Sequence, residues 1–161
     1  MTTTRNPEPA GPAPTYQDPL KKGLPADHAR RVARQILAGP HLSVLATTNA
    51  DGSAQMSVIF VKPDGDDILF STIKGRRKTT NMLRDPRVTL LLHSLARGTV
   101  VPYATIHGTV ELTDDPGGAF HQVMYDLHMG GATPPPEPGA HRLTVRVRPL
   151  RAYAPFPYSS E

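Results

Sequence analysis

Three apolar, β-branched segments follow one another in the middle of the chain, with only a few residues between them. They span 41–48 (HLSVLATT), 55–62 (QMSVIFVK) and 67–73 (DILFSTI). The first connection, 49–53 (NADGS), contains an Asp-Gly pair, and the second, 63–66, is a short turn of similar chemistry. Connections this short join antiparallel strands, because a parallel pair needs a crossover of a dozen or more residues. The segments therefore predict an antiparallel meander.

Three more segments are typical of strands. Residues 88–93 (VTLLLH) form a continuous apolar run, and 103–112 (YATIHGTVEL) carries Gly108 where a β-bulge is expected. The last segment, 141–148 (HRLTVRVR), alternates between apolar and polar residues. Six strands with few helices predict a mainly β fold with α additions, a six-stranded antiparallel barrel. A doubly wound parallel sheet would need a helix between most strands.

Three helices are expected around this sheet. Residues 27–38 repeat apolar side chains at i, i+3 and i+4 and are followed by a Gly-Pro stop. Residues 74–84 (KGRRKTTNMLR) predict a short helix entered through Gly75 and ended by an Asp-Pro pair. A third helix, 116–129, begins at a proline and is capped by Asp115.

The chain is predicted to form one domain, 25–154, between two tails. Residues 1–24 are rich in proline and lack apolar periodicity, so we expect a disordered N-terminal arm. Residues 155–161 form a C-terminal tail. No apolar core of a signal peptide follows the first methionine, and no stretch of about 18 apolar residues predicts a membrane span.

Composition excludes several classes of site. The 161 residues include no cysteine, which rules out disulfides, thiolate metal sites and cysteine nucleophiles and favours a cytoplasmic protein. His121 and His128 lie two helical turns apart, too far to chelate one metal, and are interpreted as a hydrophilic stripe. The net charge of +4 permits a nucleic-acid partner, but no aromatic platform accompanies the basic helix, so none is expected.

The best candidate for a binding site is the segment 70–78 (FSTIKGRRK). A strand delivers Ser71 and Thr72, a glycine allows a turn, and a helix then begins beside Arg76, Arg77 and Lys78. The free amides of a helix start attract anions, and guanidinium and ammonium groups add charge-assisted hydrogen bonds. The competing interpretation is a solvated basic turn. Cations crowded at the positive end of a helix are unfavourable without an anion, which favours a phosphate site.

The strand 55–61 is the second candidate. Its alternation places Gln55, Ser57 and Ile59 on one face, while Met56, Val58 and Phe60 lie on the other. One face must pack against the barrel interior, and the other could meet the edge of a flat heterocycle. Taken alone, the pattern is better explained by plain strand packing.

The order of these motifs resembles the pyridoxamine 5′-phosphate oxidase-like superfamily, and more narrowly its actinobacterial branch that uses the deazaflavin coenzyme F420. The resemblance covers about residues 27–154. The segments that carry it are LATTNADGSAQMSV, DDILFSTIKGRRKTTNMLRDPRVTLLL, TIHGTVEL and RLTVRVRPLRAYA.

The resemblance implies a homodimeric split β-barrel with two cofactor sites at the subunit interface. Arg77 and Lys78, beside Arg76, would hold the cofactor phosphate. Ser71 and Thr72 would lie near the ribityl-phosphate stem. Three residues of the second strand would lie along the ring system: Gln55, Ser57 and Val58.

The same resemblance implies an oxidoreductase that uses reduced F420 to reduce a small organic molecule by hydride transfer. FMN on the same fold is the alternative cofactor, and a carrier that binds flavin or F420 without turnover is the non-enzymatic alternative. No catalytic acid or base is assigned. The tail 152–161 (AYAPFPYSSE) lacks an Arg- and Trp-bearing clamp, so oxidation of vitamin B6 itself is not expected.

Overall fold

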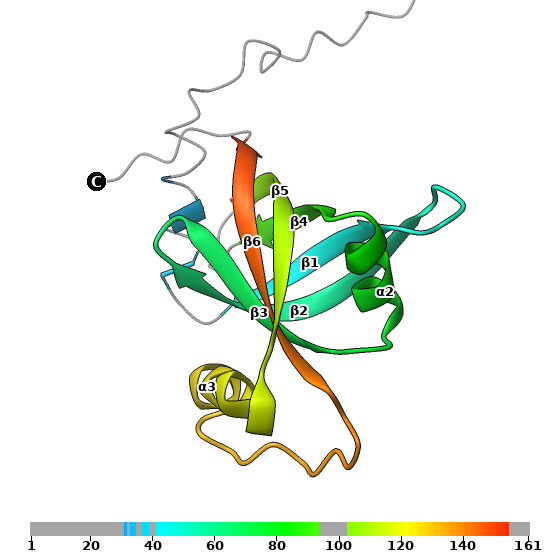
Figure 1. The fold of residues 1–161 in the computed structure, drawn as a ribbon. Coiled ribbons are helices and arrows are strands. Elements are labelled where there is room, and N and C mark those ends of the chain that lie inside the picture. The colour runs from blue at the N-terminus through cyan, green and yellow to red at the C-terminus, as the bar shows by residue number, and fades with distance from the viewer. Residues whose placement is uncertain (1–30, 32, 35–36, 39–40, 94–102, 155–161) are drawn as a thin grey trace, which may run out of the picture.

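The computed structural model describes residues 31, 33–34, 37–38, 41–93 and 103–154 (Figure 1). Three of the predicted features fall outside these residues: the N-terminal arm 1–24, the tail 155–161 and most of the helix 27–38. Within the described part of the chain, no helix has the length and hydropathy needed to cross a membrane.

The described residues form a mainly β fold with six strands, as predicted. The strands are β1 His41–Thr48, β2 Ala54–Asp64, β3 Asp67–Ile73, β4 Arg87–His93, β5 Tyr103–Asp114 and β6 Arg142–Tyr153. Two α-helices and one 3-10 turn accompany them: α2 Arg77–Arg84, η1 Pro116–Gly118 and α3 Ala119–His128.

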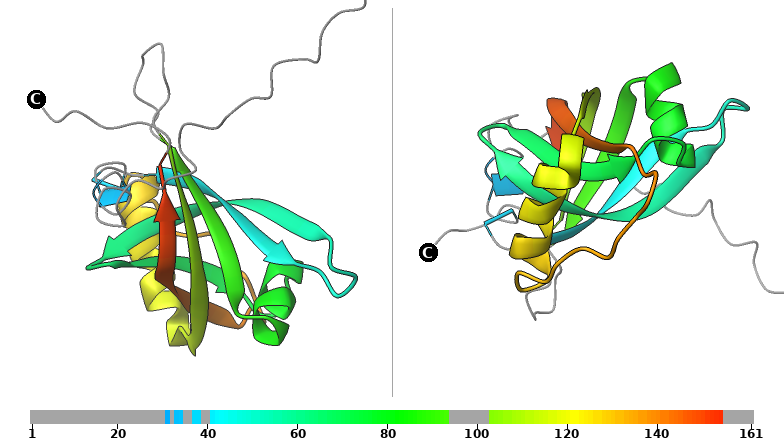
Figure 2. Two further views of the ribbon diagram at one scale, coloured as in Figure 1. Left: turned by 90° about the horizontal axis from the view of Figure 1, so that it is seen from above. Right: turned by 60° about the horizontal axis from the view of Figure 1, so that its bottom comes forward.

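The strands close into an antiparallel barrel in the order β1-β2-β3-β6-β5-β4. Pairing is uneven around it. β1 and β2 are paired along eight positions of register, whereas β2 and β3 are paired only from Lys62↔Leu69 to Asp64↔Asp67. Beyond that short ladder β3 continues along β6 and β2 along β1. The barrel is therefore split between β2 and β3, and α3 lies across this opening (Figure 2).

The barrel interior is filled by alternate side chains of all six strands. Phe70, Leu45 and Leu90 are completely buried, as expected for large apolar groups at the centre of a small core. The other buried apolar side chains of the strands are Ile59, Val61, Ile68, Leu69, Val88, Leu92, Ala104, Ile106, Leu143, Val145 and Val147. The predicted alternation of β6 is confirmed.

Gly108 marks a bulge in β5, as predicted. The register between β5 and β6 shifts between His107 and Gly108. A Cβ atom at this glycine would lie 2.6 Å from the carbonyl oxygen of Arg148. The two strands thus approach at a distance that only glycine permits.

Two helix starts differ from the prediction. The helix expected from residue 74 begins at Arg77, because Gly75 has a φ of +90° and Arg76 is extended. The helix expected from Pro116 begins at Ala119, because Gly117 interrupts it with a φ of +72° and leaves a separate 3-10 turn. Asp115 still caps α3, although it reaches past that turn to accept hydrogen bonds from the amides of Phe120 (2.9 Å) and His121 (3.0 Å).

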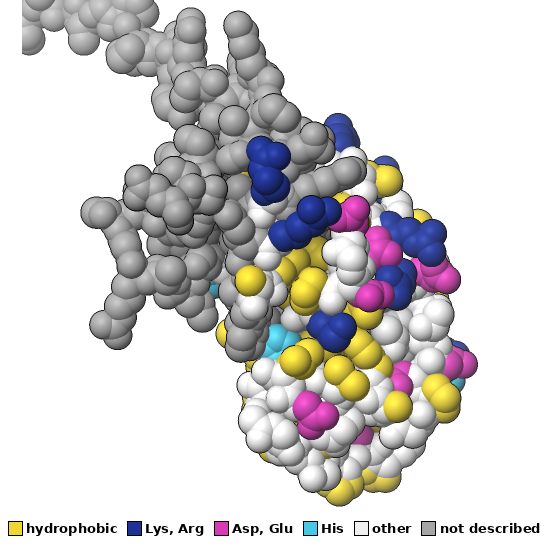
Figure 3. Space-filling model, turned by 90° about the vertical axis from the view of Figure 1, so that its left-hand side faces the viewer, with side chains coloured by type: hydrophobic (Ala, Val, Ile, Leu, Met, Phe, Trp, Pro, Cys, Tyr) yellow, Lys and Arg dark blue, Asp and Glu magenta, His cyan; other side chains and the backbone are white. Residues whose placement is uncertain are grey.

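One face of the molecule combines apolar and charged groups (Figure 3). Acidic and basic side chains on this part of the fold are paired: Arg146 bonds to Asp64 (2.7 Å) and Asp67 (2.9 Å), and Arg34 to Asp66. In Figure 3, apolar side chains gather among basic and acidic ones. The surface positive charge of the chain is therefore partly neutralised by neighbouring carboxylates.

Candidate functional site

A groove of ≈ 250 Å³ lies where β2 and β3 separate. β2 contributes one wall, β3 and the start of α2 another, and α3 with the following loop a third. The lining residues are Val58, Ile59, Phe60, Ser71, Arg76, Lys78, His121, Met124, Tyr125, Met129, Glu137 and Arg142.

The helix α3 is held over this groove by contacts with β2. The ring of His128 stacks on Phe60 with centroids 4.7 Å apart, and its Nε2 lies 3.0 Å from the carbonyl oxygen of Val61. Met124 on the same helix is buried beneath it. The predicted hydrophilic stripe is therefore wrong for His128, because its side chain packs against the strand instead of facing only solvent.

One end of the groove carries positive charge that no carboxylate offsets. Lys78 is only 9% exposed, and no acidic side chain pairs with it among the described residues. Burial, together with the charge of Arg76, lowers the pKa of Lys78. Arg76 caps α2 in an extended conformation, with no side-chain hydrogen bond at the cap and no acidic residue in the first turn. An anion would relieve this arrangement, because it would meet both the cations and the helix amides.

Unpartnered polar atoms collect at the same place. Within the described residues, the buried side-chain atoms without a hydrogen bond include Ser71 Oγ, both ring nitrogens of His121 and Nε of Arg142, all from residues that line the groove. Ser57 Oγ on β2 is another. Buried polar groups are normally hydrogen-bonded, so these atoms indicate a ligand with several acceptors. The residues present fit a molecule that bears a phosphate or carboxylate.

Four of the eight residues singled out in the sequence line this groove: Val58, Ser71, Arg76 and Lys78. Gln55 and Ser57 belong to the same strand but do not line it. The side-chain oxygen Oε1 of Gln55 accepts a hydrogen bond from the hydroxyl of Thr47 (2.9 Å), and its side-chain Nε2 donates to the backbone carbonyl of Met56 (3.0 Å).

Thr72 and Arg77 also lie outside the groove lining. Thr72 is fully buried and hydrogen-bonded to Thr79. Arg77 is exposed, and its charge acts on the β1–β2 turn. There the hydrogen bonds of Ser53, with a smaller effect of Arg77, lower the pKa of Asp51.

The third wall of the groove was not foreseen from the sequence. Tyr125, Glu137 and Arg142 approach β2 and β3 only because α3 and the loop after it fold back across the split. Arg142 is ion-paired with Glu137. No local pattern in 119–142 signals this contact, since it depends on the packing of segments more than fifty residues apart.

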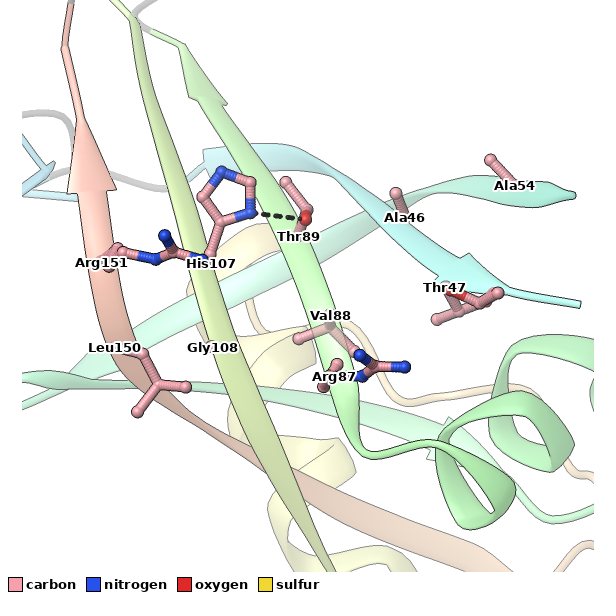
Figure 4. Close-up of a pocket in the computed structure, with 11 residues that line it drawn as sticks. Ala46, Thr47, Ala54, Arg87, Val88, Thr89, His107, Gly108, Leu150 and Arg151 are labelled. Carbon is pink, nitrogen blue, oxygen red and sulfur yellow. Dashed lines mark hydrogen bonds between the residues drawn. The ribbon is translucent and has the colours of Figure 1, made fainter. Parts of the chain in front are cut away.

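A larger hollow of ≈ 460 Å³ opens on the outer face of the sheet (Figure 4). In it, Nδ1 of His107 lies 3.0 Å from the hydroxyl of Thr89, and Arg87 is held by Asp85. None of the buried unpartnered atoms belongs to its lining. We therefore place the candidate site in the smaller groove. The described residues contain no cluster of three or more potential metal ligands in either place.

The barrel, its split and the groove beside the split define the class of protein. Residues 29–153 match the family model of pyridoxamine 5′-phosphate oxidase. The chain belongs to this family, as the resemblance in the sequence predicted.

Solved structures agree with this assignment. An F420 reductase is 29% identical, with a TM-score of 0.67 over 74% of this chain and 94% of that one. A conserved hypothetical protein from Mycobacterium tuberculosis is 21% identical, with a TM-score of 0.60 over 83% and 90% of the two chains. A putative pyridoxamine 5′-phosphate oxidase from Listeria innocua shares the fold at 16% identity, with a TM-score of 0.60 over 78% and 96%. No curated protein matches the chain.

Proposed function

We propose that this protein is an oxidoreductase that uses reduced coenzyme F420 to reduce a small organic substrate by hydride transfer. The observation that carries the proposal is the buried, uncompensated charge of Lys78 beside Arg76 and the unpartnered hydroxyl of Ser71. This set suits the phosphate of a cofactor. The family match supports the fold-level class, and the F420 reductase at 29% identity favours the deazaflavin.

In this proposal Lys78 and Arg76 bind the phosphate, and Ser71 and Thr72 lie near the stem that joins it to the ring. Arg77 adds longer-range positive charge. Val58 offers an apolar surface to the ring, and Gln55 and Ser57 lie along the same strand. A bound deazaflavin or flavin would supply the hydride chemistry, while the protein orients it and tunes its electrostatics. We assign no catalytic acid or base.

The outer face of β1 and β2 supports a homodimer in the proposed function. Met56 and Val58 are 65% and 63% exposed, and Phe60 and Leu42 are both 39% exposed. The register pairs Leu42 with Phe60, Val44 with Val58 and Ala46 with Met56, so these apolar side chains form one continuous surface. A second copy would cover it beside the groove. With no cysteine in the chain, we also propose a cytoplasmic enzyme that acts on small molecules, without nucleic-acid or membrane partners.

Titration of the purified protein with F420 and with FMN tests the choice of cofactor. We expect quenching of the intrinsic F420 fluorescence at micromolar protein and weaker binding of FMN. Tight binding of FMN without any response to F420 would replace the deazaflavin by FMN in the proposal.

Turnover tests the enzymatic part separately. Protein loaded with reduced F420 is mixed with a panel of quinones, enones and tetrapyrroles, and cofactor oxidation is followed by absorbance. Oxidation that depends on both protein and substrate supports an oxidoreductase. Cofactor that binds and is never consumed supports the alternative of a carrier.

A further inference from the structure

His121 is a half-buried titratable side chain in the groove that has no assigned role. It lies in the first turn of α3, and its ring packs edge-on against Tyr125 with centroids 4.9 Å apart. Both ring nitrogens are buried and neither has a hydrogen-bond partner. An imidazole always has at least one N–H to donate, so this ring is arranged to meet something that enters the groove.

Charged groups from several neighbouring segments act on this ring. Arg142 at the start of β6 and Arg76 before α2 contribute positive charge; Glu137 in the loop after α3 and Asp115 before η1 contribute negative charge. Both carboxylates are engaged already, Glu137 with Arg142 and Asp115 with the backbone amides at the start of α3. Burial first, and then Arg142, lower the pKa of His121, so the ring is neutral at neutral pH while no anion is present.

We propose that His121 is a proton-coupled anion-binding residue, which takes up one proton from solvent when an anionic group enters the groove between Arg76, Lys78 and Arg142. The anion supplies the acceptor that the ring nitrogens lack, and the imidazolium then donates from both nitrogens. The shared chemistry is a phosphate or carboxylate. It could belong to the cofactor or to an acidic substrate, and the identification of the first source rests on the proposed function.

Proton uptake determines the direction in which anion affinity changes with pH. An anion near His121 raises its pKa above the value in the ligand-free protein. Anion affinity then increases as pH falls through the higher of these two values, and levels off below the lower one. For each unit by which the anion raises the pKa, affinity changes about tenfold. The phosphate monoester of FMN itself titrates near pH 6, but that effect is common to wild type and variants.

The first experiment uses inorganic phosphate and the imidazole resonances of the wild-type protein, so that it requires no cofactor and no variant. Long-range ¹H–¹⁵N spectra are recorded from pH 5 to 8 with and without saturating phosphate. We expect the pKa of His121 to rise with phosphate, whereas phosphate should leave the imidazole resonances of His107, in the hollow on the outer face of the sheet, in place. A pKa of His121 that phosphate leaves unchanged, or the absence of phosphate binding, would overturn the proposal.

The second experiment identifies the source of the anion. His121→Gln keeps a hydrogen-bonding side chain without the titration, and His107→Gln is the matched control. Binding of FMN and of riboflavin, which lacks the phosphate, is measured between pH 5.5 and 8. If the affinity of the wild type for FMN rises at low pH relative to that of His121→Gln, and its affinity for riboflavin does not, the anion belongs to the cofactor.

The other source gives a different result. If benzoate added to FMN-loaded protein shows the pH-linked rise and FMN itself does not, the anion belongs to the substrate. A constant ratio of wild type to His121→Gln for all three probes rejects the coupling. Failure of both FMN and F420 to bind would reject the proposed function, while the phosphate titration would still decide the role of His121.

Discussion

The hydroxyls of Thr72 on β3 and Thr79 on α2 lie 3.1 Å apart and are both completely buried. Thr79 donates its single proton to the carbonyl oxygen of Ile73 (2.9 Å), so Thr72 is the donor between the two threonines. This chain of two hydrogen bonds fixes the first turn of α2 against the end of β3. Thr72 thus has a structural role beside the basic groups, whatever else it contacts.

Replacing Thr79 by valine should therefore loosen α2. The substitution conserves volume but leaves the buried hydroxyl of Thr72 without its acceptor and the carbonyl of Ile73 with only the longer hydrogen bond from the Arg76 amide (3.4 Å). We expect a cost of about 1–3 kcal/mol in the free energy of unfolding. Urea denaturation measures this change. Thr80→Val on the exposed side of the same helix is the control and should change stability by less than about 0.5 kcal/mol. Equal effects of the two substitutions would contradict the assigned role of the buried pair.

Lys78→Ala should weaken binding of a phosphate-bearing cofactor by about 1.5–3 kcal/mol, as expected for a lost charge-assisted hydrogen bond. Arg77→Ala should weaken it less, because Arg77 is exposed and does not line the groove. Fluorescence or calorimetric titration distinguishes them, with Lys74→Ala as a control for net charge. If Arg77→Ala proves as damaging as Lys78→Ala, the phosphate position would have to be moved toward the β1–β2 turn.

Gly108→Ala should destabilise the barrel by about 1–3 kcal/mol, because the new methyl group would meet the backbone oxygen of Arg148 at 2.6 Å. The strands can relieve this overlap only by moving apart at the bulge. Thermal or urea unfolding tests it, and Thr113→Ala, at an exposed position of the same strand, serves as the control. An alanine variant as stable as wild type would show that the two strands separate easily here.

Acid should weaken the link between α2 and β4. Hydrogen bonds from the side chain and backbone of Arg87 lower the pKa of Asp85 to about 2, below its usual value of 3.8. A carboxylate with a depressed pKa stabilises the fold above its unfolded-state pKa and loses that contribution as pH falls through the folded value.

Between pH 4 and pH 2 the wild type should therefore lose more stability than Asp85→Asn. Urea midpoints across this range measure the loss, and Asp126→Asn on α3 is the comparison. Parallel curves for wild type and Asp85→Asn would show that the side chain of Arg87 does not hold the carboxylate in solution.

Local patterns in the sequence were sufficient to predict the fold class. Strand alternation, turn residues and the glycine of the bulge act over a few positions, and the six strands and the bulge predicted from them are present, although β2 and β6 extend beyond their expected ends, to Asp64 and Tyr153. The predicted helix starts were a few residues too early, because Gly75 and Gly117 adopt positive φ values that are incompatible with an α-helix. Propensity does not reveal such a choice, since glycine is compatible with several conformations.

Only part of the candidate site could be predicted from the sequence. Arg76 and Lys78 follow the strand that contains Ser71 within a few residues, so their proximity to Ser71 could be predicted from the sequence. His121 and Arg142 come from distant segments, and their burial depends on how α3 covers the split. The hydrogen-bonding state of these two side chains could not be inferred from the local sequence pattern.

The short ladder between β2 and β3 has an evolutionary consequence. At residues 57–60, the edge of β2 that faces β3 is not paired with another strand of the described chain, which leaves its peptide groups open to the groove. Peptide groups are the same whatever side chain they carry. Under the proposed function, mutations at 57–60 would alter the shape and polarity of the accepted ligand while contacts to the main chain persist, so new specificities could arise at this edge without rebuilding the barrel.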